Sequence, residues 1–197
     1  DVIKQDLATH GLSLFDHFNI KYVTLHKDDS IQVRLEETKQ IMSEILSGND
    51  PIYEDNKIIV HKIPKPNSSE PFLLLGSGWH VFDADTMLRA TMKNSEILIV
   101  NPTNSEISVT LNVLLSSIEK EKTITVSVNN GEQSRVNIPT TFNNIQIENL
   151  ILKPGVNVVT FDTNEFTIME LGHQGTEAGK GIKMTMSFNV RSITIQP

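Results

Sequence analysis

The chain has 197 residues, with 24 acidic against 17 basic side chains and a formal net charge of −7. This acidic balance offers no basic field to a phosphate backbone and argues against nucleic-acid binding. The absence of cysteine excludes disulfides, thiolate metal sites and a cysteine nucleophile. No stretch approaches the roughly 18 consecutive apolar residues of a membrane span, so the chain is expected to be soluble by itself. Because it begins with Asp1 and not Met, we expect a longer parent protein.

Residues 1–66 mix helical and strand periods. An apolar stripe at helical spacing runs over residues 1–18, and Gly11 is a candidate break within it. A strand is predicted at 20–25, and a helix from Ile31 to the stop signal at Gly48. Two short strands are predicted on either side of a turn at residues 54–56. The order helix, strand, helix, strand, strand indicates a small α/β unit.

The stretch PKPNSSEP, residues 64–71, carries linker chemistry and predicts a boundary between a domain at 1–66 and a second domain at 67–197. Beyond it, segments of alternating apolar and polar residues are separated by turn signals such as Asn130-Gly131 and Lys153-Pro154-Gly155. About seven or eight short strands without intervening helices predict an antiparallel, jelly-roll-like β-sandwich. The fold class expected for the whole chain is therefore α+β.

The single tryptophan, Trp79, begins a short polar and aromatic stretch. If exposed, it would stack on a sugar ring while His80, Asp83, Asp85 and Arg89 bind hydroxyl groups; if buried, it would anchor the first strand of the sandwich. Aromatic residues make up only 6% of the chain, which is sparse for a sugar-binding face, so burial is favoured. These five residues remain the candidate ligand-binding set, with carbohydrate as the expected ligand.

The polar turn at residues 26–29 follows a predicted strand and is a candidate catalytic site. His26 would act as a base beside an aspartate. In the simpler interpretation, Lys27 and Asp28 are solvated, and Asp29 or Ser30 caps the following helix. Capping explains each residue without further assumptions, and it is the interpretation we favour.

A glycine-rich stretch, GHQGTEAGKG at residues 172–181, departs from the phosphate-loop pattern. Only three residues separate Gly175 from Gly179, and Gly181 follows the lysine where Ser or Thr is required. A flexible loop between two strands is expected instead.

The spacing of the residues gives little indication of a metal or cofactor site. The six histidines show no paired metal spacing, and no nucleophile motif is present, so no catalytic residue, no metal ligand and no cofactor are expected. Asp83 with Asp85, and Asp162 with Glu165, are weak candidates for a structural calcium ion, which needs six to eight oxygen ligands.

The first part of the chain has a family resemblance. LFDHFNIKYVTLHKDD, an amphipathic helix and then PIYEDNKIIVHKI are similar to the soluble stretch after the last membrane span in multi-spanning glycosyltransferases of the GT-C superfamily. Asn19 stands where glycine is usual in that pattern, and His61 lies near the usual tyrosine.

The second part resembles the carbohydrate-binding-module-like β-sandwich that often follows in those proteins. The resemblance is carried by GSGWHVFDADTMLRATMKNSEILIVNP, LKPGVNVVTF and SFNVRSITI. Gly78, Trp79 and Arg89 match the pattern, and Ala90 replaces an aromatic residue.

The resemblance implies a non-catalytic C-terminal region of a membrane-embedded glycosyltransferase-like protein, at the extracytoplasmic face of the membrane. This region would stabilise the membrane part or position a glycan or protein acceptor. The alternative is a free-standing carbohydrate-binding module that targets a partner enzyme or surface. A third interpretation, a soluble enzyme using residues 26–29, requires a pocket where those side chains converge. The sugar, the acceptor and the oligomeric state stay open.

Overall fold

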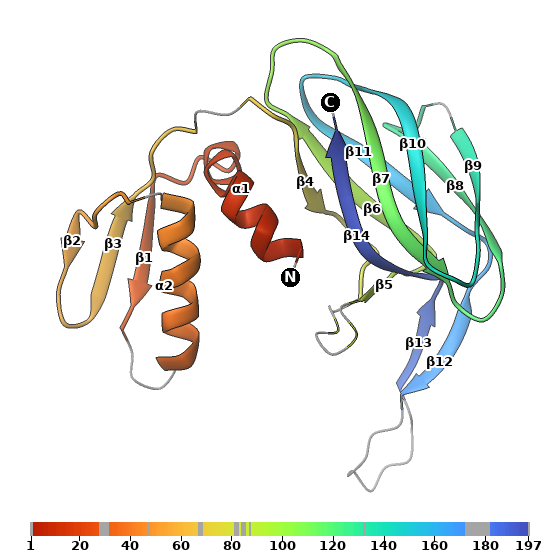
Figure 1. Cartoon of the computed structure of the whole chain (residues 1–197), viewed down its shortest axis with the longest axis horizontal. Coiled ribbons are helices and arrows are strands. Elements are labelled where there is room, and N and C mark those ends of the chain that lie inside the picture. Colours follow the sequence, from red (N-terminus) through yellow and green to blue (C-terminus); the bar gives the residue numbers. More distant parts are fainter. Residues whose placement is uncertain are drawn as a thin grey trace, which may run out of the picture. The chain divides into compact units, whose positions relative to one another are not determined.

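The computed structural model describes residues 2–27, 32–46, 48–66, 69–80, 83, 86, 88–131, 133–171 and 182–196. The chain divides into two compact units, Asp1–Ser69 and Glu70–Pro197, and the division falls inside residues 64–71 (Figure 1). Among the described residues, no helix combines the length and the apolar character that a membrane crossing needs.

The first unit has the predicted order of elements. It comprises α1 (Val2–His17), β1 (Tyr22–His26), α2 (Gln32–Leu46), β2 (Tyr53–Glu54) and β3 (Ile58–Lys62). The three strands form an antiparallel sheet in the order β1-β3-β2. Its core lies between sheet and helices, because the cross-strand pair Leu25 and Ile59 is buried with Ile45 and Leu46 of α2.

The helix predicted over residues 1–18 is continuous, because α1 runs through the candidate break at Gly11. A Cβ atom built on Gly11 would lie 2.9 Å from a side-chain carbon of Ile45 in α2. Glycine therefore allows the two helices to pack closely, and this contact outweighs its low helix propensity.

The second unit is an antiparallel β-sandwich, so the predicted fold class is confirmed. Its strands are β4 (Phe72–Leu75), β5 (Arg89–Ala90), β6 (Asn94–Asn101), β7 (Ile107–Ser117), β8 (Lys122–Val128), β9 (Gln133–Ile138), β10 (Asn143–Leu152), β11 (Gly155–Asp162), β12 (Thr167–Leu171), β13 (Ile182–Met186) and β14 (Phe188–Gln196). One sheet has the order β10-β7-β14-β5 and the other β4-β6-β11-β8-β9, while β12 and β13 pair as a hairpin (Figure 1).

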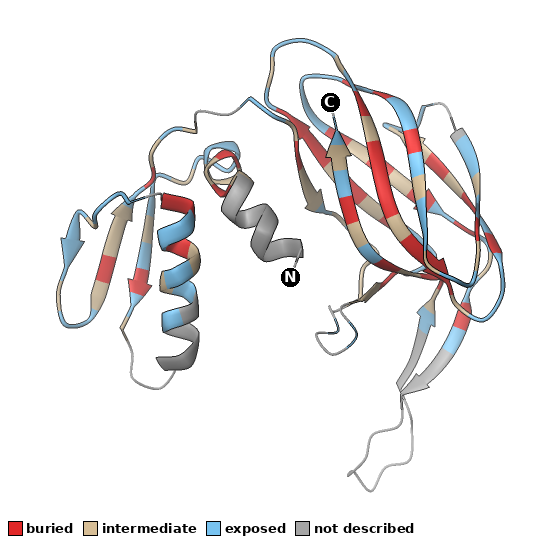
Figure 2. Ribbon diagram, in the orientation of Figure 1, coloured by how far each residue is buried: buried red, intermediate tan, exposed pale blue. Residues whose placement is uncertain are grey.

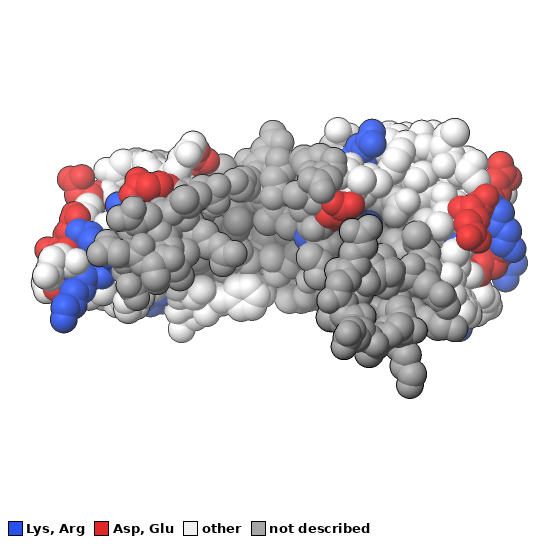
Figure 3. All heavy atoms as spheres, turned by 90° about the horizontal axis from the view of Figure 1, so that it is seen from below, with Lys and Arg blue, Asp and Glu red and all other residues white. Residues whose placement is uncertain are grey.

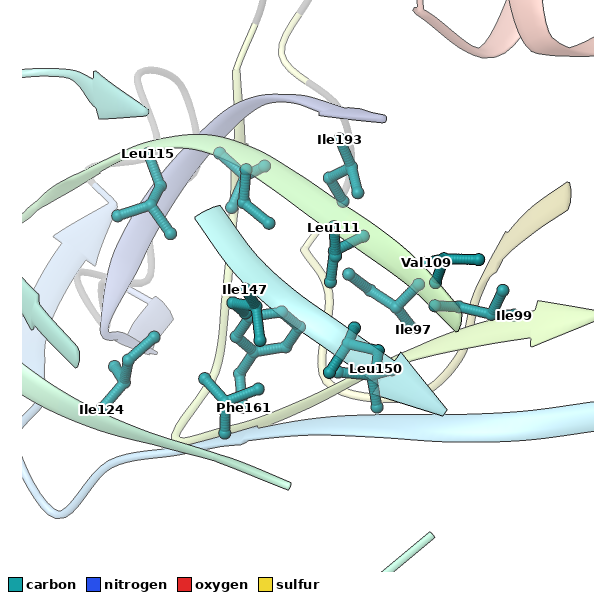
Figure 4. Packing of buried hydrophobic residues seen from close by; sticks show 14 of the residues in the cluster. Ile97, Ile99, Val109, Leu111, Leu115, Ile124, Ile147, Leu150, Phe161 and Ile193 are labelled. Atoms are coloured by element: carbon teal, nitrogen blue, oxygen red, sulfur yellow. The ribbon is translucent and has the colours of Figure 1, made fainter. Parts of the chain in front are cut away.

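The core of the sandwich is built by alternation along its strands. Leu111, Val113 and Leu115 of β7 are almost completely buried, and they belong to the same cluster as Ile97 and Ile99 of β6. Figure 4 shows Leu111, Leu115, Ile97 and Ile99 among the apolar side chains gathered between the ribbons of the strands. In Figure 2, buried segments alternate with less buried ones along several strands of this unit.

Buried asparagines hold the ends of strands together. Asn157 of β11 is fully buried, and its Oδ1 accepts hydrogen bonds from the Lys153 backbone N at 2.9 Å and from Asn129 Nδ2 at 2.9 Å. Its Nδ2 donates to the carbonyl oxygens of Lys153 at 2.8 Å and Gly155 at 3.1 Å. The side chain of Asn157 thus bonds the backbone groups of the turn that was predicted from the sequence at residues 153–155.

Replacement of Asn157 by alanine should lower the free energy of unfolding of the sandwich by about 2–4 kcal/mol, because buried donors and acceptors lose their partners. The measurement is denaturant unfolding followed by the fluorescence of Trp79, the single tryptophan, which lies in this unit. The control is Asn137→Ala, since Asn137 is exposed and its Oδ1 accepts a hydrogen bond from Thr123 Oγ1 at 2.9 Å at the sheet surface. Equal unfolding midpoints for the two variants would contradict the prediction.

Candidate functional site

The turn after β1 ties two parts of the first unit together. Lys27 Nζ donates to Glu54 Oε1 at 2.6 Å and to the Asp55 carbonyl oxygen at 2.6 Å. The hydrogen bond from Lys27 holds the pKa of Glu54 below its usual value. The expectation that Lys27 is simply solvated is therefore wrong, because its side chain links β1 to the turn between β2 and β3.

The remaining parts of that turn, Asp28, Asp29 and Ser30, lie outside the described residues, so the capping prediction stays a prediction. The glycine-rich stretch at residues 172–181 lies outside them as well.

The calcium candidates that the structure describes belong to no cluster of three or more acidic or histidine side chains. No group of three or more His, Asp or Glu side chains that could hold a metal ion occurs among the described residues. Glu165 forms an ion pair with Lys120, with Oε2 and Nζ 2.8 Å apart. The hydrogen bond from Lys120 lowers the pKa of Glu165. Asp85 lies outside the described residues.

The candidate residues around Trp79 lie on two antiparallel arms. Trp79 bridges to Thr91 and Asp83 to Leu88, and the His80 backbone N donates to the Ala90 carbonyl oxygen at 2.9 Å. Gly78 has a φ of 80°, and a Cβ atom there would lie 1.8 Å from the Asn94 carbonyl oxygen. Only glycine therefore lets this segment run so close to β6.

Trp79 is half-buried and packs against the main core of the sandwich. Its indole Nε1 donates to the Glu96 carbonyl oxygen at 2.7 Å. The apolar contact and the bonded N–H together hold the segment of Trp79 against β6.

Two further candidates meet beside Trp79. His80 Nε2 donates to the Thr185 carbonyl oxygen at 3.0 Å, and Arg89 Nη1 donates to the His80 carbonyl oxygen at 3.1 Å. Burial lowers the pKa of Arg89. Asp83 is exposed near the turn of the two arms, where it accepts a hydrogen bond from Thr86 Oγ1 at 2.8 Å. The structure therefore brings Trp79, His80 and Arg89 together, with Asp83 farther out.

A second polar surface lies on the outer face of the four-stranded sheet. Asn112 is flanked in β7 by core residues Leu111 and Val113, so its side chain points to the opposite face. Its cross-strand partners are Gln146 of β10 and Thr194 of β14. We call these three residues, Gln146, Asn112 and Thr194, the polar rung.

The polar rung has one unused donor. Gln146 Nε2 donates to Asn112 Oδ1 at 3.0 Å, whereas Asn112 Nδ2 has no hydrogen-bond partner. Asn112 is only 9% exposed, but Gln146 and Thr194 on either side of it are exposed. Nδ2 of Asn112 is closed to solvent, so a ligand on this face would meet the exposed Gln146 amide and the exposed Thr194 hydroxyl, and not this N–H.

An aromatic ring and a cation contact each other beside this sheet. Phe142 directly precedes β10, and the guanidinium carbon of Arg191 in β14 lies 4.3 Å from the centroid of its ring. The four-stranded sheet and the residue before β10 thus carry amide groups, a hydroxyl group and a partly exposed aromatic ring, which are groups of the kind that bind sugars.

Sequence reasoning did not find the polar rung, because its members come from three strands that are far apart along the chain. The only signal was a polar residue between apolar neighbours on each strand, which also describes an ordinary solvent-facing position.

No protein-family model matches the chain, and no curated protein matches it. Similar solved structures include a family 35 carbohydrate-binding module of Abf62 from Cellvibrio japonicus, with 16% identity and a TM-score of 0.36 over 64% of this chain and 96% of that one. A family 35 module from an environmental isolate has 15% identity and a TM-score of 0.38 over 62% and 90%. A β-(1,4)-mannanase from Podospora anserina with such a module has 17% identity and a TM-score of 0.39 over 62% of this chain and only 28% of that one.

Trp79→Ala should lower the free energy of unfolding by about 3–5 kcal/mol, because the core loses a large aromatic ring and the Glu96 carbonyl loses its donor. Scanning calorimetry measures the effect without relying on tryptophan fluorescence. Phe166→Ala serves as the control, since Phe166 is 48% exposed and its truncation should cost much less. If both variants unfold at the same temperature, Trp79 is not an anchor.

Proposed function

We propose that the second unit is a non-catalytic carbohydrate-binding β-sandwich whose glycan contacts lie on the outer face of the four-stranded sheet. The observation that carries this proposal is the exposed amide of Gln146 and the exposed hydroxyl of Thr194, which the strand register sets on either side of Asn112. Neutral amides and hydroxyls of this kind pair with sugar hydroxyls without supplying an acid or a base.

The aromatic and cationic pair at Phe142 and Arg191 supports the same ligand class. The ring is partly exposed, and a sugar ring carries C–H groups on its faces that pack on an aromatic surface. The sequence SFNVRSITI, whose resemblance to carbohydrate-binding modules was noted above, spans most of β14 and supplies both Arg191 and Thr194.

The segment around Trp79 has a mainly structural part in this proposal. The indole N–H of Trp79, Nε2 of His80 and Nη1 of Arg89 are all bonded to backbone carbonyls within the chain. Asp83 is exposed, and we propose it as the residue of this segment that would meet a glycan at the edge of the sandwich.

The parent protein in this proposal is a membrane glycosyltransferase-like protein with this chain at its extracytoplasmic face. The sequence resemblance of residues 1–66 supports that context. The alternative, a free-standing carbohydrate-binding module, is supported by the sandwich being a compact unit of its own. Repeated apolar spans of about 20 residues upstream of Asp1 in the gene would favour the membrane parent, and their absence would favour the free module.

A glycan array followed by titration calorimetry tests the binding face. Gln146→Ala combined with Thr194→Val should weaken glycan binding by about tenfold, because two neutral hydrogen bonds are removed beside Asn112. The matched control is Thr123→Val with Asn137→Ala, which removes an exposed hydroxyl–amide pair from the other sheet.

Two results would reject the proposed face. One is the absence of glycan binding by the unmodified chain, and the other is an equal loss in the control pair. If Asp83→Ala abolishes binding while the polar-rung variant does not, the site belongs to the segment around Trp79 instead.

A further inference from the structure

The first unit contains a pocket that none of the preceding chemistry uses. It has a volume of about 380 Å³ and lies where the end of α1 meets β1 and the residues that follow β3. The residues that line it are Asp16, Ile20, Lys21, Lys62, Ile63, Pro64 and Lys65. We call it the lysine pocket.

The lysine pocket is lined mainly by positive charge, whereas the chain as a whole is negative. Three lysines and one aspartate line it, although the chain as a whole carries a net charge of −7. The aspartate neutralises little of this charge, because Asp16 Oδ1 lies 3.8 Å from Lys21 Nζ and both side chains are about half exposed. Within the described part of the chain, the salt bridges do not include Lys62 or Lys65.

On the face drawn in Figure 3, several Lys and Arg side chains lie next to Asp and Glu side chains. Like charges at one pocket repel, so three lysines around a single cavity are stabilised when an anion enters it.

The other half of the lining is apolar. Ile20, Ile63 and Pro64 contribute hydrocarbon to the wall, and the Ile63 backbone N is already bonded to the Lys21 carbonyl oxygen at 2.9 Å. Tyr22, the cross-strand partner of Lys62, is 57% exposed next to this wall in the sheet register. The pocket therefore offers cations and hydrocarbon to the same ligand.

We propose that the lysine pocket binds a phosphate ester that carries an apolar group. Lysine ammonium groups bind phosphate as point charges, without the planar fit that a guanidinium requires. The apolar wall would receive the hydrocarbon next to the phosphate, and the volume lies within the usual range for small-ligand pockets. A metal cation is disfavoured by the positive charge of the three lysines, and a neutral sugar would gain hydrogen bonds from them but no charge pairing.

Two kinds of ligand carry a phosphate ester next to an apolar group: a phospholipid at a membrane surface and a free phosphate ester. The proposal does not depend on glycan binding by the sandwich. The probes are vesicles of phosphatidylcholine with and without phosphatidylglycerol, used in co-sedimentation, and a soluble short-chain phosphatidylglycerol, used in NMR titration.

We expect the chain to bind the phosphatidylglycerol probe in at least one of these forms, and Lys62→Gln with Lys65→Gln to weaken that binding by about tenfold. Lys57→Gln with Lys153→Gln is the matched control, since it removes the same charge from two exposed lysines elsewhere. The control should bind nearly as well as the unmodified chain. Both variants replace exposed side chains, and equal unfolding midpoints verify that each is folded.

Binding to vesicles assigns the pocket to a membrane headgroup, and binding to the soluble lipid alone assigns it to a free phosphate ester; both support the proposal. It is overturned if neither probe binds, or if the control variant loses as much affinity as the pocket variant. The polar-rung variant Gln146→Ala with Thr194→Val should bind both probes normally, which separates a failure here from a failure of glycan binding.

Discussion

The pairing of β7 with β10 on one side and β14 on the other determines both faces of the four-stranded sheet. Because successive side chains of a strand point in opposite directions, burial of Leu111, Val113 and Leu115 places Asn112 and Leu114 on the outer face. The same register sets Gln146 and Thr194 beside Asn112. A slip by one residue would expose the core and dismantle the polar rung together, so fold and candidate site rest on one constraint.

Other polar groups inside the sandwich do have hydrogen-bond partners. Asn157 uses both ends of its amide to close a turn, and Trp79 gives its indole N–H to a backbone carbonyl. Buried polar groups are bonded in this way in most structures, since an unpaired one costs free energy. The hydroxyls of Ser95 and Ser187 are also unpaired, but Asn112 differs from them in being flanked by exposed amide and hydroxyl groups on a sheet face.

Much of the fold could be predicted from the sequence, because period-two alternation and turn residues are local signals. Whether the helix breaks at Gly11 could not be decided from the sequence, because helix propensity is local whereas the contact of Gly11 with Ile45 is tertiary. Lys27 was misjudged for the same reason, since its partner Glu54 lies 27 residues away. The polar rung and the lysine pocket could not be predicted, because each is assembled by strand pairing or by the meeting of a helix end with a sheet.

The two candidate surfaces differ in the forces available to a ligand. Charges farther apart than about 8 Å are screened at physiological ionic strength, so an anion at the lysine pocket responds to the nearby lysines more than to the net charge of the chain. Attraction there should weaken as salt is added. The polar rung consists of neutral amides and a hydroxyl, and its hydrogen bonds are nearly indifferent to salt. Salt dependence therefore separates the two kinds of recognition in the intact chain, because each surface belongs to its own unit.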